Sequence, residues 1–256
     1  MTPSISPGTL FQSLTSLDLF DAADCRRLAT QMWVGRYGRV LALQSETSTA
    51  RIQLLDDGYE GFVPAHNLEI NARDRLQIRI VTSLPNSTQL LTPNDIRDRL
   101  PAILSYAETA AQQPNHYLWG GTIGPNFDCS GIVQRSFASQ DIRVPRDSYQ
   151  QADFCEPLLN RVPRPDELAH LRAGDLIFFQ FGHRVDHVAI YWGDGRYLHS
   201  SGPEHGRNGF GWDYVVPELA ESTADDPIGT QYRQRICRIG RVTSSLPFPA
   251  IAALAA

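Results

Sequence analysis

Short apolar runs separated by turn residues dominate the first third of the chain. Runs of this kind, rich in branched residues, are typical of short β-strands. They lie at Arg39–Leu43, Ala50–Leu55 and Leu76–Val81. The polar turn Asp56-Asp57-Gly58 separates two of them. The pattern predicts a small all-β barrel over residues 28–82, with residues 1–27 as an N-terminal extension.

A polar segment that contains a proline, Ser83–Gln89, then gives way to helical periodicity. Thr92 fits a helix N-cap, Pro93 the first helical position and Asp95 the acid of a capping box. Pro101 is expected to end or kink this first helix, after which a second segment continues the apolar face. The linker is assigned to residues 83–95.

The second half of the chain mixes helix and strand patterns. A glycine-rich loop over residues 118–127 precedes a helix that is expected to begin at Asp128-Cys129-Ser130. Strands are predicted at Leu176–Phe181, His187–Trp192 and Arg196–Ser200, and Gly193-Asp194-Gly195 marks a hairpin between the last two. The fold class is therefore α+β over residues 96–245, preceded by the barrel, with residues 246–256 as a tail.

Composition and charge narrow the classes of function. The chain has 256 residues, 42% of them apolar and 20% charged, and a net charge of −5. An acidic chain argues against nucleic-acid binding. Acidic residues interrupt the N-terminus where a signal peptide needs an apolar run, and no run is long enough for a membrane span. A cytoplasmic protein with no membrane or nucleic-acid partner is expected, with its four cysteines as free thiols.

Cys129 differs from the other cysteines because its position predicts chemistry. It stands where a glycine-rich loop meets a helix start, and the dipole and N–H groups there favour the thiolate. Cys25, Cys155 and Cys237 have no such context and are interpreted as packing residues.

A thiol nucleophile needs a base and a group that orients the base. With Trp192 opposite Arg196 across a three-residue loop, the numbers of opposing residues add up to 388. His187 and His199 then lie diagonally on one face of the hairpin, close enough for ring contact. A loop one residue longer or shorter would place them on opposite faces. The spacing favours His187 as base and His199 as its orienting partner.

At this point the sequence resembles the NlpC-type cell-wall endopeptidases, which have a papain-like fold. Six stretches in the family's order carry the resemblance: Tyr117–Thr122, Phe127–Gly131, Pro145–Gln151, Ala173–Phe179, His187–Gly195 and Leu198–Gly202. The N-terminal part resembles the bacterial SH3-like barrel of the recycling subgroup, including Tyr59.

The resemblance implies a catalytic triad of Cys129, His187 and His199. It implies cleavage of the bond between γ-D-glutamate and a diamino acid, meso-diaminopimelate or L-lysine, in stem peptides with a free N-terminal L-alanine. It also implies six substrate-binding residues. Asp128 and Tyr59 would receive the α-amine, Arg146 and Ser148 the D-glutamate carboxylate, and Tyr117 and Ser130 would complete the pocket. The residue types suit these roles, because carboxylates and aromatic rings bind ammonium groups and arginine binds carboxylates.

Several other interpretations remain open. Arg146 is equally suited to an ion pair with Asp147 or Asp175, and Tyr59 to simple packing in the barrel. Asp186 and the charged loop 183–185 depart from the commonest family pattern, which leaves the preferred diamino acid and the pH profile open.

Two other functions are alternatives to the leading one. The same triad could hydrolyse intact cell wall or amide lipids after export, or the chain could be a binding module that acts through its barrel. The four histidines at positions 183, 187, 199 and 205 raise the question of a metal site, but Gly182 and the strand pattern spoil the helical spacing that one would need. No cofactor or metal is implied.

Overall fold

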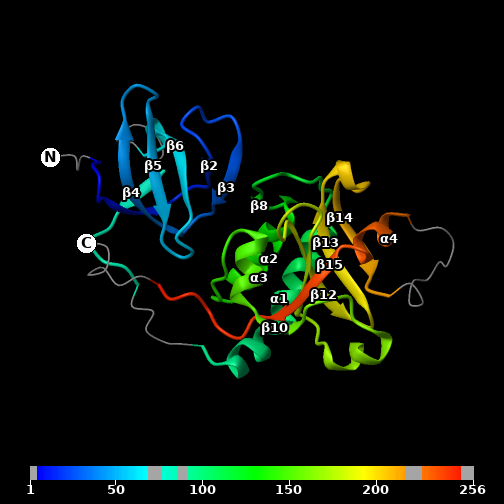
Figure 1. Cartoon of the computed structure of the whole chain (residues 1–256). Coiled ribbons are helices and arrows are strands. Elements are labelled where there is room, and N and C mark those ends of the chain that lie inside the picture. Colours follow the sequence, from blue (N-terminus) through cyan, green and yellow to red (C-terminus); the bar gives the residue numbers. More distant parts are fainter. Residues whose placement is uncertain (1–4, 69–76, 86–90, 217–226, 249–256) are drawn as a thin grey trace. The chain divides into compact units, whose positions relative to one another are not determined.

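The computed structural model describes residues 5–68, 77–85, 91–216 and 227–248, which form two compact units (Figure 1). The barrel unit comprises Met1–Leu90, Gly120–Ile123 and Leu246–Ala256, and the α+β unit comprises Leu91–Trp119 and Gly124–Ser245. Barrel residues 69–76, linker residues 86–90 and tail residues 249–256, which the sequence analysis treats, lie outside the described residues.

The barrel unit is an antiparallel sheet in the order β3-β2-β6-β5-β4-β1-β7. Its strands are β1 (Leu10–Ser13), β2 (Leu17–Phe20), β3 (Leu28–Met32), β4 (Tyr37–Gln44), β5 (Thr49–Leu54), β6 (Glu60–Pro64) and β7 (Ile78–Ile80), and a 3-10 turn, η1 (Ala65–Leu68), follows β6. The predicted boundary at residue 28 is wrong, because β1 and β2 belong to this sheet. Both strands are only four residues long, too short to give a clear alternation in the sequence.

A buried arginine supports the turn that carries Tyr59. Arg36 is buried and its guanidinium pairs with Asp56 and Asp57, each at 2.8 Å. Asp57 Oδ1 also accepts the backbone N–H of Tyr59 at 3.0 Å. The side chain of Tyr59 packs against the apolar core of the barrel. The polar turn seen in the sequence is therefore held from inside the barrel.

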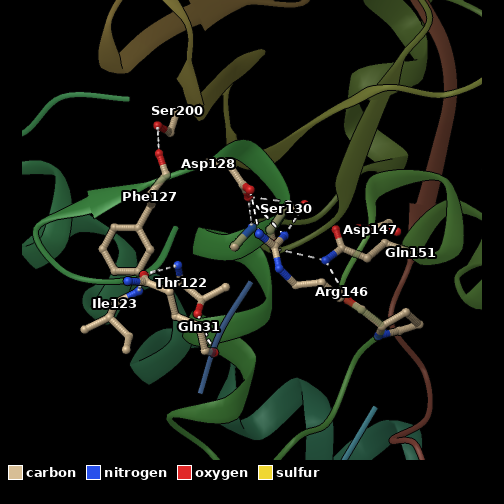
Figure 2. Close-up of polar contacts among 12 residues, drawn as sticks. Gln31, Thr122, Ile123, Phe127, Asp128, Ser130, Arg146, Asp147, Gln151 and Ser200 are labelled. Carbon is tan, nitrogen blue, oxygen red and sulfur yellow. Dashed lines mark hydrogen bonds and ion pairs between the residues drawn. The ribbon is translucent and has the colours of Figure 1, made fainter. Parts of the chain in front are cut away.

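Residues 120–123, from the glycine-rich loop, group with the barrel unit. Oε1 of Gln31 accepts the N–H groups of Thr122 and Ile123 at 3.0 and 3.1 Å, and the Thr122 hydroxyl donates to the Gln31 carbonyl at 3.0 Å (Figure 2). One side chain of β3 thus satisfies two consecutive backbone donors of this loop. The short strands β8 (Thr122–Ile123) and β9 (Asn126–Phe127) also lie in the loop.

The α+β unit is built on an antiparallel sheet in the order β10-β15-β11-β12-β13-β14. Its strands are β10 (Glu156–Leu159), β11 (Leu176–Phe179), β12 (His187–Gly193), β13 (Arg196–Ser201), β14 (Gly209–Tyr214) and β15 (Ile236–Arg241). Every residue of β11 is buried, because its alternate side chains enter two different cores. Leu176 and Phe178 pack in the core that includes the first two helices, and Ile177 and Phe179 pack on the opposite face. A strand covered on both faces explains the continuous apolar run in the sequence.

In the described residues, four helices accompany this sheet: α1 (Pro93–Ala111), α2 (Cys129–Ala138), α3 (Ser148–Phe154) and α4 (Pro227–Arg233). Short 3-10 turns lie at η2 (Pro165–His170) and η3 (Pro203–His205). The predicted cap of α1 is confirmed, because Thr92 and Asp95 form a capping box ahead of Pro93. The predicted break at Pro101 is wrong, since α1 continues through it. No helix in the described residues is long and apolar enough to cross a membrane.

Candidate active site

Cys129 is the first residue of α2, as the sequence predicted. Asp128 is the N-cap of this helix, and its Oδ1 accepts the N–H of Gly131 at 2.7 Å. The hydroxyl of Ser200 on β13 donates to the carbonyl of Phe127 at 2.7 Å (Figure 2). The residue after His199 therefore anchors the chain two residues before Cys129. This bond ties the start of α2 to the strand that carries one of the two histidines.

The two histidines meet on the hairpin of β12 and β13. His187 Nε2 and His199 Nδ1 lie 2.8 Å apart, within hydrogen-bond distance. The pairing of Ile190 with Leu198 has the predicted sum of 388, so this register is confirmed. The turn itself differs from the prediction, because Gly193 rather than Trp192 pairs with Arg196. A bulge after Tyr191 absorbs the extra residue and keeps both histidines on one face.

Cys129 lies beside the base-bearing strand. Its sulfur is in contact with the backbone N–H of Val188, the residue after His187, and with the N–H of Ser130. Only 6% of Cys129 is exposed, and burial raises the pKa of its thiol to about 12. The negative charge of Asp128 also raises the pKa of the thiol. The two N–H groups and the positive charge of Arg146 lower it, but they do not outweigh burial. The predicted preformed thiolate is therefore wrong for the free site, because the helix start is too deeply buried. The thiol is protonated at rest.

Both histidines are neutral for the same physical reason. Burial lowers the pKa of His187 well below 6.5, and the charges of His199 and His205 add to the effect. Burial also lowers the pKa of His199, although its hydrogen bond with Asp213 opposes the shift. The resting site thus holds a neutral thiol and, on the first residue of the neighbouring strand, a neutral imidazole that is able to accept a proton.

Asp213 and Tyr232 surround the histidines but were missed in the sequence. Asp213 on β14 lies 2.8 Å from His199 Nε2 and is also paired with Arg207. The Tyr232 ring lies 5.2 Å from that of His187 and 4.5 Å from that of His199, measured between centroids. The alternation Gly209-Phe-Gly-Trp-Asp-Tyr214 was a possible signal for β14.

A buried ion pair joins three of the predicted substrate-binding residues. Arg146 Nη1 donates to Asp128 Oδ1 at 3.1 Å and to Ser130 Oγ at 2.8 Å, while Nη2 donates to Asp128 Oδ2 at 2.6 Å (Figure 2). Arg146 is 2% exposed. The alternative partner Asp175 is instead bound by Arg241. Arg146 is therefore an ion-pair partner of the helix cap.

Two of the remaining predicted residues, Ser148 and Tyr117, belong to the same unit as this pair. Ser148 is buried at the first position of α3, two residues after Arg146. Gln151 of the same helix donates to the carbonyl of Ser130 at 3.0 Å, which ties α3 to α2. Burial raises the pKa of Tyr117, and Cys129 and Asp128 act in the same direction, so this phenol lies close to both groups. Tyr59 belongs to the barrel unit, and its role in binding stays a prediction.

Asp186 has a specific structural role in the loop before the base. Its two carboxylate oxygens accept the N–H groups of Phe181 and Gly182 at 2.9 and 2.7 Å. The Arg184 guanidinium lies 3.9 Å from the ring centroid of Tyr149 on α3. The charged loop is thus held at two points: Asp186 binds the N–H groups of Phe181 and Gly182, and Arg184 packs on Tyr149 of α3.

Comparison with known proteins agrees with this geometry. The model of the NlpC/P60 family matches residues 114–225, and that of the bacterial dipeptidyl-peptidase SH3 domain matches residues 19–68. The Bacillus cereus gamma-D-glutamyl-L-lysine dipeptidyl-peptidase is 45% identical over 87 residues, which is 33% of this chain and 24% of that protein. The Escherichia coli murein DD-endopeptidase MepS/murein LD-carboxypeptidase is 35% identical over 86 residues, which is 33% of this chain and 42% of that protein.

The matched segment therefore spans 24% and 42% of the lengths of these two curated relatives. The crystal structure of an NlpC/P60 family protein from Bacillus cereus superposes with a TM-score of 0.61 and 19% identity, covering 92% of this chain and 99% of that one. This likeness confirms the fold, a papain-like domain preceded by an SH3-like barrel.

Proposed function

Because residues 114–225 form a domain of the NlpC/P60 family and residues 19–68 a bacterial SH3 domain, we propose that this chain is a cysteine peptidase. Its substrates would be peptidoglycan stem peptides, cut at the bond between γ-D-glutamate and the diamino acid. The peptides would carry a free N-terminal L-alanine and arise in the cytoplasm during cell-wall recycling.

One observation carries the proposal: a buried thiol at a helix start lies beside the strand whose first residue is a neutral histidine. His187 is oriented by His199 through the 2.8 Å contact of their rings. A nucleophile, a base and an orienting group in this arrangement are the parts that thiol acyl transfer requires. A pure binding module has no use for all three.

The resting protonation states define the first chemical step. The Cys129 sulfur attacks the γ-carbonyl carbon of D-glutamate while its proton passes to the neutral His187. The resulting imidazolium gives that proton to the leaving amine, which departs as the diamino acid. Water then attacks the thioester with His187 as base, which releases the dipeptide and restores the thiol. The N–H groups at the start of α2 are suited to stabilise the oxyanion.

The pocket supports the choice of substrate through its charges. Asp128 and the neighbouring Tyr117 offer a carboxylate and an aromatic ring to the ammonium group of L-alanine. Tyr59 is assigned to the same group by the family resemblance. Arg146 holds Asp128 in place and adds positive charge for the D-glutamate carboxylate, near Ser148. The Bacillus cereus relative is named for the gamma-D-glutamyl-L-lysine bond, in which L-lysine is the diamino acid.

The test is incubation with L-Ala-γ-D-Glu-meso-diaminopimelate, its L-lysine analogue and an N-acetylated form of each. Mass analysis should detect the dipeptide L-Ala-D-Glu from the free peptides only, and Cys129→Ala should abolish the product. Cleavage of the acetylated forms with the free peptides left intact would overturn the proposed specificity. Intact peptides in every reaction would overturn the proposed activity on them.

A further inference from the structure

A buried carboxylate, that of Asp213, is hydrogen-bonded to the second histidine, His199, inside the α+β unit. Asp213 Oδ2 lies 2.8 Å from His199 Nε2, and its other oxygen is paired with Arg207. Asp213 is 3% exposed, so the whole chain from His187 to the carboxylate is shielded from water. Gly211 faces His199 across the pairing of β13 and β14. A Cβ at Gly211 would lie 2.8 Å from Nε of Arg207, so this glycine leaves room for the arginine that pairs with Asp213.

The ionisation of Asp213 decides where the protons lie. Burial acts to raise the pKa of this carboxyl, but the hydrogen bond with His199 and the charge of Arg207 outweigh it and lower the pKa. An ionised carboxylate only accepts hydrogen bonds, so Nε2 of His199 must carry a hydrogen. A neutral imidazole has a single N–H, which makes Nδ1 of His199 an acceptor. The 2.8 Å contact then requires the hydrogen of His187 to be on Nε2.

We propose that Asp213, held by Arg207, is a positioning residue that sets the tautomers of both histidines and thereby leaves Nδ1 of His187 free to accept the thiol proton. The inference rests on the proposed function for its catalytic consequence. The tautomers themselves are properties of the folded protein and are measurable without any substrate.

Other titratable groups around His187 and His199 do not replace Asp213 as the hydrogen-bond acceptor of His199. Tyr197 on β13 and Tyr232 on α4 face the same rings, and burial raises the pKa of both phenols, that of Tyr232 to about 12. They stay neutral at pH 7.5, and Tyr232 is hydrogen-bonded to Ser201. His205 on η3 lies on the side of Phe181, and the ring centroids of His205 and Phe181 are 4.5 Å apart. Among these groups, Asp213 is the one acceptor that contacts Nε2 of His199.

The variant Asp213→Asn tests the direction of the hydrogen bonds that join His187, His199 and residue 213. Its side-chain amide is able to donate to Nε2 of His199, which moves the hydrogen to Nδ1 of that ring. His199 then donates to Nε2 of His187, and the hydrogen of His187 lies on Nδ1, where it blocks proton transfer from the thiol. We expect kcat to fall by about a hundredfold or more, as for a triad with the wrong tautomer. KM should change by less than about threefold, because binding groups are untouched.

Nitrogen-15 NMR of the histidine rings supplies a readout that a merely structural role would not move. At pH 7.5 the wild-type chain should show both rings protonated on Nε2, and Asp213→Asn should show both protonated on Nδ1. Asp213→Glu should recover the wild-type tautomers. The matched control is Asp175→Asn, because Asp175 is 2% exposed and arginine-bound like Asp213 but has no histidine partner. That control should leave kcat and both tautomers unchanged.

Wild-type spectra with the His199 hydrogen on Nδ1 would overturn the inference even if Asp213→Asn fails to fold. Unchanged kcat and tautomers in a folded Asp213→Asn protein would overturn it as well. The expected tautomers in a protein that cuts no stem peptide would support the positioning role and contradict the proposed function instead.

Discussion

Cys129 and Cys155 offer a comparison of two similarly buried thiols in different surroundings. The sulfur of Cys129 contacts the N–H of Val188, next to His187, whereas the charges that act on Cys155 are those of Asp175 and Arg238. They are 6% and 5% exposed, and burial raises the pKa of each to about 12. At pH 8 a thiol with that pKa is ionised to only about one part in ten thousand. The chemistry of Cys129 must therefore come from a nearby base rather than from a standing thiolate.

Iodoacetamide labelling measures this difference. We expect Cys129 to be alkylated at least about tenfold faster than Cys155 at pH 7.5, because His187 removes its proton during attack. In His187→Ala the two rates should become similar. Peptide mass spectrometry at several time points gives both rates from one sample. Equal rates in the wild-type chain would favour the binding-module interpretation.

Loss of the Arg146 side chain should strongly destabilise the folded state. In Arg146→Met, Asp128 would remain as a buried charge without its bidentate partner, which costs about 3–5 kcal/mol. Urea unfolding with and without the substitution measures this loss. The control is Arg164→Met, since the side chain of Arg164 is 65% exposed and its ion pairs are expected to contribute less than about 1 kcal/mol. A loss of similar size in both variants would contradict the role of Arg146 as the anchor of the α2 cap.

At the scale of elements, the sequence predicts the parts of the site that depend on local pattern. The cap of α1, the start of α2 at Cys129 and the face shared by His187 and His199 all follow from residue type and spacing. A residue in a hairpin lies on one of the two faces of the sheet, and the turn length decides which. A correct turn length is therefore nearly sufficient to predict that two residues share a face.

Contacts between distant segments are the part that the sequence does not reveal. Arg146 binds Asp128, which lies 18 residues earlier in the chain, and Asp213 reaches His199 only because β14 is next to β13. The thiol pKa was mispredicted for a related reason. The helix dipole is visible in the sequence, whereas the depth of burial that outweighs it depends on the packing of the whole unit.

The loop between β11 and β12 is expected to control the placement of the base. Asp186→Ala removes the acceptor of two loop N–H groups immediately before His187. We expect kcat/KM to fall by about tenfold through misplacement of the imidazole. The loss in unfolding free energy should stay near about 1 kcal/mol, because Asp186 is exposed. Steady-state kinetics on the tripeptide together with urea unfolding separates the two effects.

Asp186→Asn is the matched variant, since its amide oxygen still accepts one of the two N–H groups. It should lie between the wild-type chain and Asp186→Ala in kcat/KM. An unchanged kcat/KM in Asp186→Ala would show that the strand alone positions His187.

At the scale of the whole molecule, buried polar groups are unevenly distributed between the units. In the described part of the chain, the histidines that are fully buried are His187 and His199, and both lie in the α+β unit. The barrel unit also buries charge, in the cluster of Arg36 with Asp56 and Asp57, but no histidine in its described residues. The two units should therefore respond differently to mild acid.

The sign of that response follows from the lowered histidine pKa values. In the folded state the pKa of each ring is lowered, whereas in the unfolded chain each ring takes up a proton below its usual pKa of 6.5. Stability is fully present above pH 6.5 and is lost as the pH falls toward the folded pKa values. At pH 5.5 the loss is about 1.4 kcal/mol for each histidine that stays neutral when folded.

Hydrogen exchange of the β12 and β13 amides, corrected for the intrinsic pH dependence of exchange, measures this loss. Their opening free energy should be lower at pH 5.5 than at pH 7.5, and His187→Gln should reduce the difference, because one of the two titrating rings is gone. Equal opening free energies at the two pH values would mean that the buried rings are able to take up protons in the folded state. The neutral imidazole on which the proposed proton transfer depends would then be absent in mild acid.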